Sequence, residues 1–204
     1  MFKDCTALAT APALSATILS QGCYHSMFSG CTSLTSAPVL SSTSLAVACY
    51  ESMFFNCSSL VNFSTLPATI ITRNCYYRMF YNCTDLVNGP SILPADVLEE
   101  GCYYQMFYNC TALTTAPTLP ATSLVSNCYY QMFYTCTSLV TVPATLPATT
   151  LAPGCYRGMF YGCTSLTAAP ALPATTLADY CYNSMFWGCT SLTLPSQLPA
   201  TMLA

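Results

Sequence analysis

Residues 102–110 read CYYQMFYNC, and residues 128–136 read CYYQMFYTC, the same nine letters with one change. The repetition extends over the whole chain, because the fifteen cysteines form two series with steps of 26 or 27 residues. One series is Cys5, Cys31, Cys57, Cys83, Cys110, Cys136, Cys163 and Cys189, and the other is Cys23, Cys49, Cys75, Cys102, Cys128, Cys155 and Cys181. A period of this length over an entire chain is typical of a solenoid, in which each repeat forms one coil.

Each repeat begins with a short apolar stretch that ends at a proline, as in LTSAPVL at 34–40. Proline has no backbone N–H and interrupts a sheet ladder. The pattern therefore predicts a strand of three or four residues followed by an extended Pro-rich turn. The prolines at this position are Pro12, Pro38, Pro90, Pro117, Pro143 and Pro170.

The second half of each repeat has the pattern of a short helix. Residues that can cap a helix N-terminus with a side-chain oxygen precede it, namely Thr17, Thr43, Thr69, Asp96, Thr122, Thr149, Thr175 and Thr201. Leu124, Cys128 and Met132 then follow the i, i+4, i+8 spacing of one apolar helix face. Residues that tolerate the left-handed conformation end the segment, at Asp4, Gly30, Asn56, Asn82, Asn109, Thr135, Gly162 and Gly188.

We therefore predict an α/β repeat solenoid with leucine-rich-repeat-like coils of 26–27 residues. Each coil comprises a short parallel strand, a Pro-rich turn and a short helix. Residues 1–204 are expected to form a single solenoid of about eight coils that begins and ends within a repeat.

The cysteines are expected to point inward with the Leu, Met and Phe positions. Two cysteines eight residues apart on a helix lie about 12 Å apart, too far for a disulfide, which needs Cα atoms within about 7 Å. Disulfides between adjacent coils remain an alternative, although the odd count leaves one thiol unpaired. The chain has no C-x2–4-C pair and one histidine, so no zinc site is expected and no cofactor is predicted. The simpler interpretation is that cysteine fills the core as a small apolar residue.

Composition excludes several classes of function. Charged residues make up 5% of the chain, and the net charge is −3. Because phosphate binding needs clustered Lys or Arg, a nucleic-acid partner is not expected. Polar residues and prolines interrupt every hydrophobic stretch, so no transmembrane span is expected either.

The phrases MFSGCTSLTSAP at 27–38 and MFYGCTSLTAAPALP at 159–173 resemble the BspA-like leucine-rich repeats of bacterial surface proteins. The resemblance covers essentially the whole chain. It implies a curved or twisted solenoid at the cell surface that serves adhesion or the binding of host proteins. The Pro-rich insertion, and cysteine at Cys23, Cys49 and equivalent positions, depart from the pattern of the family.

Aromatic residues recur at two positions of the predicted helix that face away from Cys128 and Met132. They are Phe55, Tyr81, Tyr108, Tyr134, Tyr161 and Trp187 at one position, and Tyr77, Tyr104 and Tyr130 at the other. Stacked coils would align them into an aromatic stripe, and an exposed stripe of this kind marks an interface. The alternative is that the tyrosines only cover the junctions between neighbouring helices, with their hydroxyls in water. Ser36, Asn62, Asn88, Thr115 and Thr141 are expected to give the strand face a polar, uncharged surface.

These features predict a non-enzymatic, extracellular or cell-surface repeat protein that provides an adhesive or structural surface. Its partner would be a host or neighbouring-cell protein, a glycan, or copies of itself. His25 lies two residues from Cys23, but its position holds Glu51 and Tyr77 in later repeats, so a catalytic Cys–His pair is not expected. The alternative is a subunit of an extracellular filament that polymerises head to tail through uncapped ends of the solenoid.

Thiol counting tests the assignment of the cysteines to the core. Freshly purified protein, denatured without a reducing agent, is expected to show all fifteen thiols of the sequence in reaction with a colorimetric thiol reagent. A lower count that rises to fifteen after reduction would instead support disulfides between coils.

Overall fold

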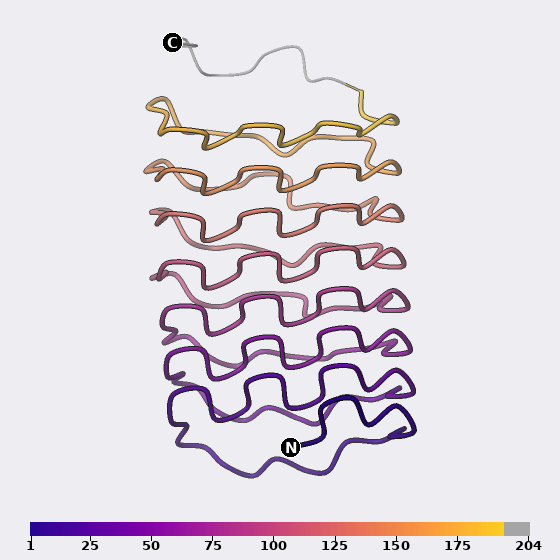
Figure 1. Ribbon diagram of the computed structural model, residues 1–204. Coiled ribbons are helices and arrows are strands. Elements are labelled where there is room, and N and C mark those ends of the chain that lie inside the picture. The colour runs from indigo at the N-terminus through magenta and orange to yellow at the C-terminus, as the bar shows by residue number, and fades with distance from the viewer. Residues whose placement is uncertain (194–204) are drawn as a thin grey trace.

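The computed structural model describes residues 1–193 as a stack of similar coils in which each coil lies directly on the next (Figure 1). Within this part of the chain there is no α-helix and no extended β-strand. Each coil has a run of consecutive turns on one side and straighter segments with isolated bridges on the other. The complete turn runs are residues 20–31, 46–57, 72–83, 99–110, 125–136, 152–163 and 178–189. The repeat solenoid is as predicted, but the predicted helices are wrong.

Backbone hydrogen bonds explain why the turn runs are not helices. In the run 99–110, the N–H of Tyr104 donates to the carbonyl of Gly101 at 3.2 Å and closes a turn. The next N–H, of Gln105, donates instead to the carbonyl of Tyr130 on the following coil at 2.8 Å. The two kinds of bond alternate along the turn runs from 20–31 to 152–163, so about half of the amides in these runs close turns and half join coils. An α-helix would use every amide within its own segment.

Each complete turn run requires a left-handed residue at every fourth position. In the run 99–110 these are Gly101, Gln105 and Asn109, with φ values of 63°, 50° and 57°. The left-handed conformation predicted for the last of them, and for its equivalents from Asp4 to Gly188, is confirmed. The other two positions in each run were not predicted. Because there is no helix, the expected capping role of Thr17 and its equivalents is also wrong within residues 1–193, and Thr201 lies outside them.

On the other side of the coils, isolated parallel bridges replace the predicted strands of three or four residues. Ser36 pairs with Asn62, and Asn62 pairs with Asn88; Ser123 pairs with Thr150 on a second ladder. Proline follows the first ladder two residues later in most coils, as Pro38 does after Ser36. Because proline has no N–H to donate, each strand ends almost where it begins.

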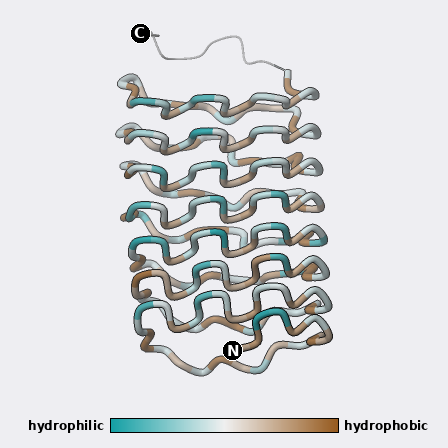
Figure 2. Tube along the Cα trace, in the orientation of Figure 1, coloured by the Kyte–Doolittle hydropathy of each residue, from teal (hydrophilic) through white to brown (hydrophobic). Residues whose placement is uncertain are grey.

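Columns of aromatic rings, one ring from each coil, fill the core. Phe28, Phe54, Phe80, Phe107, Phe133 and Phe160 stack with ring centroids 5.4–5.7 Å apart and are fully buried. Tyr50, Tyr76, Tyr103, Tyr129 and Tyr156 stack beside them at 5.6–5.9 Å. Figure 2 shows hydrophilic residues at several of the bends of the turn runs, and a mixture of polar and hydrophobic residues along the rest of each coil. Stacked aromatic pairs stabilise a fold by about 0.5–1.5 kcal/mol each beyond their buried area.

Twelve of the fifteen cysteines are buried in the core as predicted, whereas Cys5 and Cys23 of the first coil are exposed and Cys189 is half-buried; all are free thiols. The series that ends each turn run has a specific role. Cys110 Sγ donates to the carbonyl oxygen of Phe80 at 3.0 Å, and Cys136 Sγ donates to that of Phe107 at 3.1 Å. The same bond recurs from Cys31 to Cys189. Cysteine therefore suits this buried position, because its side chain is small and apolar and its thiol donates a weak hydrogen bond to the carbonyl.

Ala48 offers a test of the left-handed positions, because it is an alanine with φ of 52° where Gly22 stands one coil earlier. The Ala48→Gly variant is expected to raise the free energy of unfolding by about 1 kcal/mol, since glycine adopts this conformation without steric cost. Urea denaturation followed by circular dichroism measures the change. Ala152→Gly, at a position that is not left-handed, serves as the control and should lower stability by about 0.5–1 kcal/mol. Equal effects of the two substitutions would contradict the turn assignment.

The buried thiols predict unfolding at alkaline pH. Desolvation by burial raises the pKa of Cys155 to about 11 and those of Cys57 and Cys136 to about 12. In the unfolded chain a thiol ionises near pH 8.5. The buried, protonated thiols therefore stabilise the folded protein fully below about pH 8.5. This stabilisation is lost as pH rises toward 11–12, by about 1.4 kcal/mol per pH unit for each buried thiol. Melting temperatures measured from pH 7 to pH 11 should fall steeply above pH 9, and a flat profile would contradict the burial of protonated thiols.

Candidate interaction surface

The aromatic residues predicted to form a stripe lie on the turn-run side of the stack, in two columns. In the outer column, Phe55, Tyr81, Tyr108, Tyr134 and Tyr161 stack with ring centroids 4.4–4.8 Å apart. In the second column, Tyr77, Tyr104 and Tyr130 stack at 4.6–4.8 Å. The rings within each column are within 13° of parallel. The structure thus aligns these predicted residues; their role in binding stays a prediction.

The stacking decides which parts of the rings a partner can contact. Each inner ring of a column has a neighbouring ring against both of its faces, and these tyrosines are neither buried nor fully exposed. Their edges and hydroxyls therefore form the accessible surface. Trp187 differs, because it is 68% exposed and makes no ring stack with Tyr161 in the part of the chain that the structure describes.

A ladder of amide side chains runs between the two tyrosine columns. Arg78 Nε donates to Gln105 Oε1 at 2.7 Å, and Gln105 Nε2 donates to Gln131 Oε1 at 2.6 Å. Gln105 is buried, with 7% of its surface exposed. A second ladder lies beyond the outer column, where Asn109 Nδ2 donates to Asn82 Oδ1 at 2.9 Å. These ladders fix the spacing of neighbouring coils and make the surface between the tyrosines rigid.

Two arginines give this surface its positive charge. The guanidinium carbon of Arg78 lies 5.0 Å from the ring centroid of Tyr77 and 5.6 Å from that of Tyr81. That of Arg157 lies 5.8 Å from the centroid of Tyr130. All three distances suit a cation–π contact. The arginines thus lie beside the ends of the shorter column, one at Tyr77 and one at Tyr130.

Three tyrosines of the columns, Tyr104, Tyr108 and Tyr134, have raised pKa values. Desolvation by burial, and then the neighbouring Tyr130, raises the pKa of Tyr104 to about 12. Burial is also the main cause of the raised pKa values of Tyr108 and Tyr134. The columns therefore present hydroxyl groups that can both donate and accept hydrogen bonds at physiological pH.

Sequence reasoning missed the amide ladders, although the sequence carried a signal for them. Gln105 and Gln131 occupy the same place in the two nearly identical stretches, so coils stacked in register must bring their amides together. The structure also places His25 Nδ1 3.8 Å from Glu51 Oε2 on the next coil. Among residues 1–193, no group of three His, Cys, Asp or Glu side chains could hold a metal ion.

Membrane-spanning helices were also sought in the described part of the chain. None of its residues forms a helix of the length and hydrophobicity that crossing a bilayer requires.

The family model described as BspA type leucine rich repeat region (6 copies) matches residues 1–142 and 102–200. No curated protein matches the chain significantly.

Three solved structures of leucine-rich repeat proteins match the chain at low sequence identity. A protein from Bacteroides ovatus is 23% identical over 57% of this chain and 26% of its own, with a TM-score of 0.38. One from Eubacterium ventriosum is 16% identical over 84% and 41%, with a TM-score of 0.47. The T. pallidum leucine-rich repeat protein is 23% identical over 78% and 64%, with a TM-score of 0.44. The chain thus spans less than two thirds of the length of each of them.

Proposed function

Because the chain belongs to the BspA-type leucine-rich repeat family, we propose that it is a non-enzymatic protein of the cell surface or extracellular space that provides a binding surface. The observation that supports this proposal is the rigid face formed by the two tyrosine columns and the amide ladder between them. Tyrosine and arginine are the residues that contribute most to protein–protein interfaces.

The geometry of the columns favours a protein partner over a glycan on this face. A sugar ring stacks its C–H groups against the open face of an aromatic ring, but Tyr108 has Tyr81 and Tyr134 against its two faces. The exposed edges and hydroxyls suit backbone and side-chain polar groups of a protein instead. Because the buried amide ladder already fixes the neighbouring coils, these side chains lose little conformational freedom on binding.

The chemistry of this face offers little to catalysis. The pKa values of Tyr104, Tyr108 and Tyr134 are raised, and a nucleophile or general base needs the opposite shift. Arg78 and Arg157 provide positive charge without a carboxylate partner among the ion pairs of the described residues. We therefore assign this surface to recognition.

Self-association is the second candidate, either laterally through the tyrosine face or head to tail through the ends of the solenoid. Identical coils in register form the same kind of aromatic and amide ladders that pair sheets in cross-β assemblies. Sedimentation velocity of the purified chain separates this candidate from the first, because a concentration-dependent series of oligomers would favour it over an external partner.

Replacing two tyrosines of the outer column tests the binding surface. The Tyr108→Ser/Tyr134→Ser double variant is expected to bind a protease-sensitive partner on intact bacterial or animal cells at least about tenfold more weakly, since each buried interface tyrosine contributes about 2 kcal/mol or more. Flow cytometry with the fluorescently labelled protein measures binding before and after the cells are treated with protease or with glycosidases. Loss of binding after glycosidase treatment alone would contradict a protein partner.

Ile18→Ser is the control for this experiment, because Ile18 is 92% exposed and lies outside both columns. It should leave cell binding unchanged. If the double variant keeps the circular dichroism spectrum and melting behaviour of the native protein but binds cells equally well, the tyrosine columns only cover the junctions between coils.

A further inference from the structure

A groove interrupts the regular side of the stack where coils of different length meet. The spacing between the two cysteine series is one residue longer from Cys83 to Cys102 and from Cys136 to Cys155 than in the other repeats. The extra residue falls between two prolines, since Pro90 and Pro94 are four residues apart where Pro117 and Pro120 are three apart. A shorter coil therefore lies between two longer ones.

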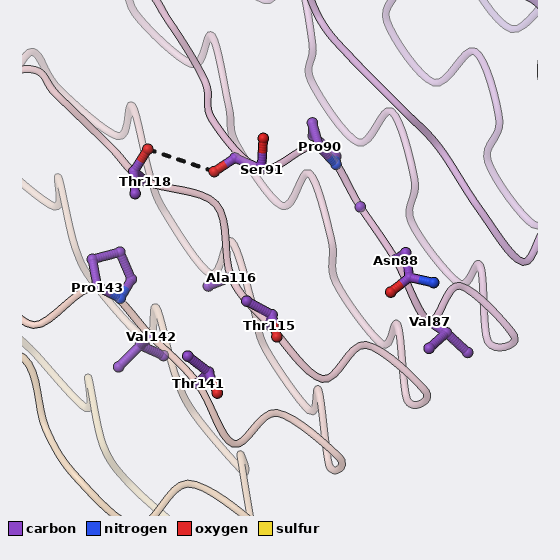
Figure 3. Close-up of a pocket in the computed structure, with 11 residues that line it drawn as sticks. Val87, Asn88, Pro90, Ser91, Thr115, Ala116, Thr118, Thr141, Val142 and Pro143 are labelled. Carbon is purple, nitrogen blue, oxygen red and sulfur yellow. Dashed lines mark hydrogen bonds between the residues drawn. The ribbon is translucent and has the colours of Figure 1, made fainter.

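The groove has a volume of about 430 Å³ and extends over all three of these coils (Figure 3). This volume is within the range of about 300–1,000 Å³ that small-molecule sites have. Ala116 from the shorter coil is buried, with 7% of its surface exposed. The rest of the groove is lined by residues 87–91 of one longer coil, by Thr115 and Thr118 of the shorter coil, and by residues 141–143 of the other longer coil.

The ladder of parallel bridges is interrupted along the same groove. One coil earlier, the N–H of Phe63 donates to the carbonyl of Asn88 at 2.9 Å, and one coil later the N–H of Ala116 donates to that of Thr141 at 2.9 Å. No isolated bridge joins Asn88 to Thr115, although Asn62 bridges Asn88 and Thr115 bridges Thr141, and no backbone hydrogen bond within the described residues joins 87–89 to 114–116. The bond equivalent to that of Phe63 is absent at Gly89, as it is at Ala37 and Val142. The N–H of Gly89 and the carbonyl of Thr115 are thus available at the groove.

The polar side chains of the groove are uncharged and include both donors and acceptors. Asn88 Nδ2 donates to Asn62 Oδ1 at 2.7 Å, which leaves Asn88 Oδ1 as an acceptor on the side of Thr115 (Figure 3). Thr118 Oγ1 donates to the carbonyl of Ser91 at 3.5 Å. Hydroxyls of Ser91, Thr115 and Thr141 complete the set, and no Lys, Arg, Asp or Glu is among the lining residues.

We propose that this groove binds a small, neutral, polyhydroxylated ligand, namely a single hexose unit. A sugar ring presents hydroxyls along its edge, which the threonines, Asn88 and the two open backbone groups can pair. Its C–H face suits Ala116, Val142 and the ring of Pro143. A charged ligand would lose its hydration without gaining an ion pair, so the groove discriminates against it. The site is separate from the tyrosine face and does not depend on the function proposed for that face.

Saturation-transfer-difference NMR on the full chain tests the site with three groups of probes. The first group is free D-glucose, D-galactose and D-mannose, the second is their methyl glycosides, and the third is D-glucuronate. We expect saturation transfer to at least one neutral hexose at millimolar concentration and at least about fivefold less to glucuronate. Binding of the methyl glycosides would indicate a hexose within a glycan, whereas binding of only the reducing sugars would indicate a free sugar.

Two groove variants and one matched control locate the binding. Ala116→Leu fills part of the groove with a larger side chain. Thr115→Val/Thr118→Val removes two hydroxyls without a change of shape. If one of these variants does not fold, the other still tests the site. Each folded variant should lower the neutral-sugar signal at least about fivefold. Thr10→Val, on the same bridge ladder but outside the groove, should leave the signal unchanged.

Three results would overturn the site. They are no transfer to any neutral hexose, equal transfer to glucuronate, and an unchanged signal in a folded groove variant. The Tyr108→Ser/Tyr134→Ser variant is expected to retain sugar binding, so failure of the tyrosine face as a protein-binding surface leaves this test intact.

Discussion

The structure depends on one constraint, which is that about half of the amides in the turn runs from 20–31 to 152–163 have their only partner in the next coil. Gln105 can satisfy its N–H only if the carbonyl of Tyr130 is in place. A single coil therefore cannot form alone, and every coil must repeat the backbone of its neighbour. Register follows directly, because a slip by one residue would place each crossing N–H opposite a residue such as Gln131, whose carbonyl already accepts a turn bond from its own coil.

Register in turn decides which side chains the repeat accepts. Equivalent residues lie directly above one another, so a charged residue at a repeated position would face a like charge on each side. Side chains that pair with copies of themselves avoid this cost. Tyrosine rings stack, amides form ladders such as that from Gln105 to Gln131, and the thiol of Cys110 reaches the carbonyl of Phe80. The 5% content of charged residues is thus a consequence of the stacking.

Sequence alone predicted the repeat, the inward cysteines and the alignment of the aromatic columns, because each depends only on the period. It failed on local structure, since a turn run with a period of four residues places side chains at i, i+4 and i+8 as a helix does. Cys102, Met106 and Cys110 are therefore buried in either structure. The distinguishing signal was a series of left-handed residues four apart, most clearly Gly154, Gly158 and Gly162, since glycine at that frequency disfavours a helix. The groove was not predictable, because it depends on how two longer coils displace the ladder around a shorter one.

The two candidate surfaces arise from opposite features of the same repeat. The tyrosine face results from coils that match, so a partner meets equivalent groups on several coils, and no single residue is indispensable. Such a face favours large partners that contact several coils at once. The groove results from coils that do not match, and it lies where the bridge between Asn88 and Thr115 is missing from the ladder. A single substitution can therefore abolish binding in the groove, whereas several substitutions are needed to abolish binding at the tyrosine face.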